Sequence, residues 1–172
     1  MKVLVVESTS RGNESFSNRL AQSVLQKLKE KNLKLEVSTR NLDKDPVLDS
    51  EAAISELKSA EVVIIGVPMH NFSIPIVLKA WIDQVVRPGQ SFRYGASGPE
   101  GLIRGKKAYL AIASGGVYSE GPMSAYDFTE PYLKAVLGFI GISDLTTFRI
   151  EGVDVPGLKD IAFEKAVESI RI

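Results

Sequence analysis

Val62-Val63-Ile64-Ile65-Gly66-Val67 is the most apolar run in this chain of 172 residues, and it decides the fold. A continuous run of β-branched and aliphatic residues, without alternation, is typical of a strand that is buried on both faces. The opening run Lys2-Val3-Leu4-Val5-Val6 has the same character and predicts a second central strand. Helices must therefore cover both faces of the sheet.

Further strand and helix patterns alternate with these two runs along the chain. We expect strands at 33–38, 108–113 and 145–150, and helices at 16–28, 50–57, 73–85, 129–140 and 158–170. Right-handed crossovers turn this alternation into an α/β fold, a flavodoxin-like doubly wound sheet of five parallel strands in the order 2-1-3-4-5, with helices on both faces. No composition shift suggests a domain boundary, so residues 1–172 are expected to form a single domain.

Two local features complete the outline of the fold. Asn13 or Ser15 is the expected N-cap of the first helix, while Ser50 and Ser73 are expected to cap the second and third. The segment 88–106 holds five of the chain's 14 Gly and is too long for a simple link, so it predicts an ordered functional loop or a small hairpin.

The chain carries 21 Lys and Arg against 21 Asp and Glu, with one His and no Cys. Balanced charge argues against a protein that binds nucleic acid by neutralising backbone phosphates. The lack of Cys excludes disulfides, thiolate metal sites and thiol nucleophiles, and one His cannot make a multi-histidine metal site. No apolar run approaches the ~20 residues of a membrane span. We expect a soluble, cytoplasmic protein without a metal, whose redox chemistry would depend on a bound cofactor.

Three loops follow the strands expected at the middle of the sheet, at residues 7–15, 68–73 and 114–121. The carboxyl ends of parallel strands meet at one edge, which is the usual ligand edge of such a sheet. The first loop places several hydroxyls and one glycine before a helix, where free backbone N–H groups and the helix dipole favour a phosphate. An ordinary polar loop with an N-cap would explain the same residues.

The second loop carries groups that suit a flat ligand. Met69 and Phe72 offer apolar contact and Asn71 offers a polar donor, although the two apolar side chains could also simply plug the top of the sheet. His70 is the single histidine. It could serve as a general base, but no Ser or Cys nucleophile has a claim to pair with it, and a lone His in such a loop is more often a packing or hydrogen-bonding residue.

The third loop is Ser114-Gly115-Gly116-Val117-Tyr118. Its paired glycines let a ligand approach the backbone closely, and Tyr118 could cover or hydrogen-bond that ligand. Two glycines after a strand are also ordinary turn residues. Together, a phosphate cradle and an apolar slot lined by amides describe a mononucleotide with a planar ring system, and in this fold that indicates flavin mononucleotide (FMN).

These segments resemble the FMN-dependent NADH-azoreductases, flavodoxin-like enzymes related to the NAD(P)H:quinone oxidoreductases. The resemblance runs nearly end to end and is most specific at Pro68-Met69-His70-Asn71-Phe72 and Gly98-Pro99-Glu100-Gly101-Leu102. It implies bound FMN, NADH or NADPH as co-substrate, and a homodimer. The activity it implies is two-electron, ping-pong reduction of quinones or aromatic azo compounds through FMN.

The resemblance also implies the residues of the site, matched by position. It places the FMN phosphate at Thr9 and at Ser15, Phe16 and Ser17. It places the isoalloxazine ring against Met69, His70, Asn71 and Phe72 on one loop and Ser114, Gly115 and Gly116 on another. The chemistry would reside on the flavin, so no catalytic side chain is assigned, and His70 and Tyr118 are candidate modulators.

The chain departs from the family pattern at three places. His70 stands where the family usually has Tyr, the family's Ser-Arg-Gly-Gly loop is shortened to Ser114-Gly115-Gly116, and the connection 41–51 is shorter than usual. Two other functions stay open at this stage. One is a flavodoxin-like electron carrier, which usually has a strongly acidic surface, and the other is a regulatory domain that keeps the fold without the cofactor.

Overall fold

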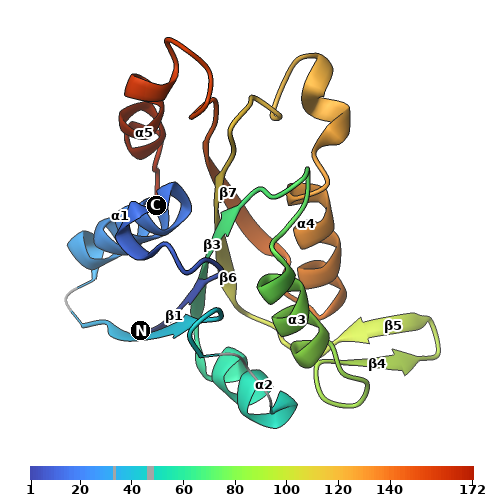
Figure 1. Ribbon diagram of the computed structural model, residues 1–172. Helices are drawn as coiled ribbons and strands as arrows, with labels where there is room; N and C mark the ends of the chain where they lie inside the picture. Colours follow the sequence, from blue (N-terminus) through green and yellow to red (C-terminus); the bar gives the residue numbers. More distant parts are fainter. Residues whose placement is uncertain (33, 46–48) are drawn as a thin grey trace.

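Five parallel strands form one twisted sheet at the centre of the molecule (Figure 1). The computed structural model describes residues 1–32, 34–45 and 49–172. The sheet has the order β2-β1-β3-β6-β7 and is built from β1 (Lys2–Glu7), β2 (Glu36–Asn41), β3 (Val62–Pro68), β6 (Lys107–Ala113) and β7 (Asp144–Ile150). Counting only these five strands, the order is 2-1-3-4-5, so the predicted topology is confirmed.

Helices cover both faces of this sheet, as the unbroken apolar strands require (Figure 1). One face packs on α1 (Phe16–Lys31) and α5 (Lys159–Glu168), and the other on α2 (Ser50–Ser59), α3 (Ile76–Val85) and α4 (Glu130–Phe139). Successive residues of a strand point to opposite faces. Val3 and Val5 therefore join the first core, whereas Leu4 and Val6 join the second.

The second strand lies further along the chain than its sequence pattern predicts. The expected bounds 33–38 are wrong, because β2 covers Glu36–Asn41. Val37, which was expected on a buried side, is 37% exposed. Position 33 lies outside the described residues. Pairing with β1 runs from Lys2↔Glu36 to Glu7↔Asn41. Backbone pairing decides the position of this edge strand, because its alternating apolar side chains bury little surface.

Of the helix caps predicted from the sequence, only that of α1 is confirmed. Ser15 is its N-cap, but Asp49 rather than Ser50 caps α2, where its carboxylate accepts from the Glu51 N–H at 2.9 Å. The proposed Ser73 cap is also wrong, because Pro75 precedes α3 without a side-chain cap and Ser73 pairs with the backbone of His70.

The glycine-rich segment 88–106 contains a hairpin of β4 (Phe92–Gly95) and β5 (Gly98–Gly101), which projects beside α3 and α4 in Figure 1. After the hairpin, the chain continues to the amino end of β6. The hairpin therefore lies away from the sheet edge that the strands' carboxyl ends form. Gly101 permits its docking, since a Cβ there would lie 2.2 Å from the Gly141 nitrogen. Within the described ranges, no helix has the length and apolar character needed to cross a membrane.

Candidate functional site

Three loops leave the carboxyl ends of β1, β3 and β6, which are neighbours in the sheet. Adjacent strands lie about 5 Å apart, so these loops must share one edge. The connection after β7 joins them, because β7 pairs with β6. All three loops predicted to bind a ligand are therefore brought together by the strand order.

The loop after β1 presents hydroxyl groups at the start of α1. It makes a short 3₁₀ turn at Gly12–Glu14 before Ser15, and no acidic residue occupies the first turn of α1. The Ser15 and Ser17 hydroxyls lie 2.9 Å apart, and Thr9 Oγ1 accepts from the Arg11 N–H at 3.3 Å. The first N–H groups of an α-helix have no intrahelical acceptor. An anion would meet both free amides and hydroxyl donors here.

Asn18 supports this loop from below, and sequence reasoning missed it. Its side chain is 2% exposed and its Nδ2 donates to the Gly12 carbonyl at 3.2 Å. The Asn18 Oδ1 has no hydrogen-bond partner among the described residues. A Cβ on Gly66 would lie 3.2 Å from this oxygen, so the glycine within the most apolar strand makes room for the start of α1.

The loop after β3 turns through two strained residues. Asn71 and Phe72 have φ values of 47° and 70°, and His70 and Ser73 exchange backbone hydrogen bonds of 2.8 and 3.0 Å across them. Positive φ is unfavourable for a side chain as large as phenylalanine. The strain is maintained by the Phe128 N–H, which donates to the Phe72 carbonyl at 3.0 Å.

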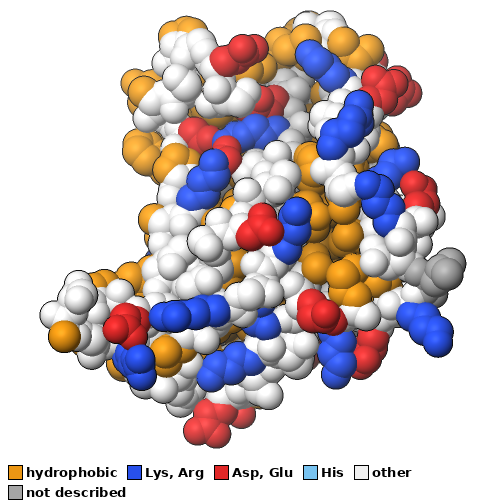
Figure 2. Space-filling model, turned by 180° about the vertical axis from the view of Figure 1, so that it is seen from behind, with side chains coloured by type: hydrophobic (Ala, Val, Ile, Leu, Met, Phe, Trp, Pro, Cys, Tyr) orange, Lys and Arg blue, Asp and Glu red, His pale blue; other side chains and the backbone are white. Residues whose placement is uncertain are grey.

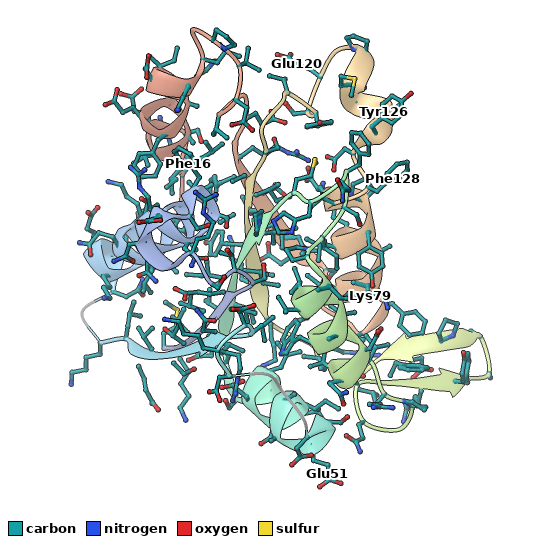
Figure 3. The ribbon with its side chains drawn as sticks, in the orientation of Figure 1. Phe16, Glu51, Lys79, Glu120, Tyr126 and Phe128 are labelled. Atoms are coloured by element: carbon teal, nitrogen blue, oxygen red, sulfur yellow. The ribbon has the colours of Figure 1, made fainter. Side chains whose placement is uncertain are left out.

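Aromatic rings gather around Phe72 at this edge. Its ring centroid lies 6.0 Å from that of Tyr118 and 5.5 Å from that of Tyr126. Tyr126 ends the 3₁₀ turn η2 (Pro122–Tyr126). Figure 3 shows Tyr126 and Phe128 on the side of α4, and Phe16 on the side of α1. The rings form a wall that could hold a flat ligand.

The loop after β6 is shaped by its two glycines. A Cβ on Gly116 would lie 3.2 Å from the Tyr118 ring, and one on Gly115 would lie 2.4 Å from the Asp154 carboxylate. Ser114 is buried beneath them, and its hydroxyl donates to the Gly116 carbonyl at 2.9 Å. A side chain at either glycine would therefore meet a residue that is already packed against the loop.

A cavity of about 440 Å³ opens between the second and third loops. It combines residues of both loops with two from the connection after β7, and it is lined by Met69, Asn71, Phe72, Gly115, Gly116, Tyr118, Asp154 and Val155. The structure thus brings together most of the predicted ring-binding residues and adds Asp154 and Val155, which the sequence reasoning missed. His70 is exposed and Ser114 lies below the loop, and neither lines the cavity.

A cluster of charges lies beside the aromatic wall. The Arg149 guanidinium contacts the carboxylates of Asp127, Glu130 and Glu151. Burial works against the ionised form of Glu130, but hydrogen bonds from Lys134, Arg149 and Thr147 outweigh it and lower the pKa of Glu130 to about 2. No sequence motif pointed to this cluster.

The sheet order, with helices on both faces, defines a flavodoxin-like α/β protein. The family model described as flavodoxin-like fold matches residues 1–171, so the chain belongs to that family.

Named relatives narrow the comparison. An FMN-dependent NADH:quinone oxidoreductase 1 of Xanthomonas axonopodis pv. citri (strain 306) is 39% identical over 169 residues, which cover 89% of this chain and 86% of the relative. One of Idiomarina loihiensis is 41% identical over 90% of each chain. The crystal structure of an azoreductase from Bacillus anthracis str. Sterne superimposes with a TM-score of 0.86 at 28% identity, covering 98% of this chain and 97% of that one.

Proposed function

We propose that this protein is an FMN-dependent NADH:quinone oxidoreductase that also reduces aromatic azo compounds. The observation that carries the proposal is the cavity between Phe72 and Gly116, set on the same sheet edge as the hydroxyl-lined start of α1. The FMN-dependent relatives at about 40% identity cover most of the chain. They support the same cofactor and the same class of acceptor here.

The start of α1 fits a phosphate group. Thr9, Ser15 and Ser17 supply hydroxyls, and Phe16 and Ser17 supply the first backbone N–H groups of the helix. Hydroxyl and amide donors to a charged acceptor form the stronger class of hydrogen bond. We assign the phosphate of FMN to these four residues, and no lysine is needed because the phosphate is held rather than transferred.

The cavity fits a flat ring. Met69, Phe72 and Tyr118 provide apolar surface, while Asn71 and the backbone of Gly115 and Gly116 provide polar contacts for its edge. We assign the isoalloxazine to this slot, with Ser114 supporting the loop from below and His70 at the exposed rim.

When bound, FMN supplies the redox chemistry by taking a hydride from NADH or NADPH and passing two electrons to the acceptor. The protein's own residues bind and orient. The aromatic wall around Phe72 excludes water from one side of the slot, and the exposed side leaves room for nicotinamide and acceptor to bind in turn. His70 and Tyr118 are the side chains placed to modulate that exposed side.

The electron-carrier alternative is not favoured. Such carriers usually have a strongly acidic surface, whereas this chain balances 21 acidic against 21 basic residues. Figure 2 shows both signs interspersed over the face it presents. The named relatives are oxidoreductases that act on quinones.

We further propose that the chain is one FMN-binding domain that works in the cytoplasm as a homodimer. Large apolar side chains are exposed beside the cavity, with Ile76 84%, Tyr126 48% and Phe128 56% exposed. A second copy covering them would complete the open side of the slot. Sedimentation of wild type and of Ile76→Asp tests this, since the variant should become monomeric.

The main test is an absorption spectrum of the purified protein, followed by NADH oxidation with a small quinone and then an azo dye. We expect flavin absorbance and steady turnover with the quinone as the sole acceptor. A protein that stays colourless after FMN is added would overturn the proposal. A protein that binds flavin but oxidises no NADH would instead support the electron-carrier function.

A further inference from the structure

Arg149 lies near the end of β7 and joins three separate segments of the chain. Its side chain is 13% exposed. It contacts Asp127, which follows η2, Glu130 in the first turn of α4, and Glu151, which follows β7. The contact with Glu151 is the longest, at 3.5 Å between Nη1 and Oε1.

Arg149 balances the negative charges of the carboxylates around it. Three carboxylates converge on it. Within the described part of the chain, Glu130 has one other cationic partner, Lys134, at 2.7 Å. Thr147 donates its hydroxyl to Glu130 at 2.7 Å. Removing Arg149 would leave three partly buried carboxylates facing one another, and like charges in such a site repel strongly.

The carboxylate of Glu151 links Arg149 to the third loop. The Tyr118 and Ser119 N–H groups both donate to its Oε1 at 2.8 Å, and the Ser119 hydroxyl donates to Oε2. Tyr118 in turn packs against Phe72 across the cavity. One side of the slot is therefore attached to Arg149 through a single carboxylate.

The carboxylate of Asp127 links Arg149 to the second loop through the start of α4. Its Oδ1 accepts from the N–H groups of Thr129 and Glu130 at 2.9 and 3.2 Å, which caps the start of α4. Between these residues, the Phe128 N–H donates to the carbonyl of strained Phe72. Arg149 is thus connected to both walls of the cavity, although it does not line the cavity itself.

We propose that Arg149 is a positioning residue that holds the loops of Tyr118 and Phe72 in the arrangement that forms the cavity, which the proposed function assigns to the flavin ring. The inference deepens the proposed function and rests on it for the identity of the ring. Its mechanical part, the restraint on the Tyr118 loop, concerns the free protein and can be measured without flavin.

The first test measures backbone amide exchange at Tyr118 and Ser119 by NMR in the flavin-free protein. In Arg149→Met we expect exchange at these two amides to accelerate about tenfold, while amides in the core of β3 keep their wild-type rates. Arg40→Met is the matched control, since Arg40 also pairs with two carboxylates, Glu56 and Asp45, but on the opposite edge strand. Unchanged exchange at both amides in Arg149→Met would overturn the inference.

The second test compares the dissociation constants of FMN and riboflavin. If Arg149 positions the ring walls, Arg149→Met should weaken both ligands by the same factor, about tenfold, because the phosphate contacts are untouched. A loss confined to FMN would contradict the inference. Should Arg149→Met fail to fold, Arg149→Lys keeps one positive charge while losing the forked contacts, and it should show the same pattern more weakly.

A double-mutant cycle with Glu151→Gln separates positioning from general destabilisation. Glutamine can still accept from the two amides but carries no charge for Arg149. If Arg149 acts through Glu151, the two losses in riboflavin affinity should be far from additive, whereas independent losses would contradict this route. A wild-type protein that binds no flavin would overturn the proposed function alone, because the exchange test would still decide the role of Arg149.

Discussion

The hydroxyl groups of Ser15 and Ser17 lie 2.9 Å apart at the first turn of α1, and both residues are buried. Ser15 also caps the helix, accepting from the Asn18 N–H at 3.5 Å. One of the two hydroxyl protons is shared within the pair, so the pair combines a structural task with hydroxyl groups at the helix start, where a phosphate is favoured.

Replacing both serines by alanine should weaken FMN and leave riboflavin unaffected. Each hydroxyl–phosphate bond is charge-assisted and worth ~1.5–3 kcal/mol, so the FMN dissociation constant should rise at least tenfold. Fluorescence titration with both ligands measures the difference. Ser23→Ala is the control, since Ser23 bonds only to the Arg19 carbonyl on α1. Equal losses for FMN and riboflavin would place the phosphate elsewhere.

Gly66→Ala should destabilise the protein, because the new Cβ would lie 3.2 Å from Asn18 Oδ1 and 3.3 Å from the Ser17 carbonyl in a buried site. Overpacking of this kind costs ~1–3 kcal/mol of unfolding free energy. Gly138→Ala is the matched control: a Cβ there meets nothing within 4 Å, and helix propensity should make it neutral or stabilising. Urea unfolding of both variants measures the contrast, and similar values for the two would contradict the close packing.

Phe72→Gly and Phe72→Ala both remove the ring from the cavity wall, so both should weaken riboflavin binding. They differ in backbone strain, because the φ of 70° suits glycine and disfavours alanine. We therefore expect Phe72→Gly to exceed Phe72→Ala in unfolding free energy by about 1 kcal/mol. Thermal unfolding of the two variants side by side measures this difference. Equal stabilities would mean that the turn is not strained in solution.

The charge cluster predicts a specific acid sensitivity. The folded pKa of Glu130 is lowered to about 2 from 4.5, so its ionised form favours the folded state above pH 4.5. That contribution should be lost as the pH falls from about 4.5 to about 2. Glu130→Gln should be less stable at pH 7 and show a flatter loss across this window. Glu100→Gln, which removes an exposed pair with Arg93, should behave like wild type.

The central strands were predictable because their signal is local. β1 and β3 are unbroken apolar runs, and such runs have few places in a fold other than the middle of a covered sheet. The edge strand β2 was misplaced because most of its side chains are exposed, so its register comes from backbone pairing with β1. The predicted caps of α2 and α3 were wrong for a related reason. Several polar residues near each helix start could act as the N-cap, and the sequence does not distinguish them.

The site was predictable as a place and less so as a geometry. Met69, Asn71, Phe72, Gly115 and Gly116 were singled out by residue type and do line the cavity. The positive φ of Phe72 carries no sequence signal, because a large side chain disfavours it, whereas Asn71 is of a residue type that adopts positive φ more readily. Asp154 and Val155 enter the cavity only because β7 pairs with β6.

By itself, the sequence determined the strand order, the helices on both faces and the sheet edge at which the three candidate loops meet, because hydrophobic periodicity and chain connectivity are enough for these. Only the tertiary structure decided which side chains face the cavity and how they are held there. Arg149, Asp127, Glu130 and Glu151 lie on separate segments, and their charges act together only where the packed fold brings them within bonding distance and limits their contact with water.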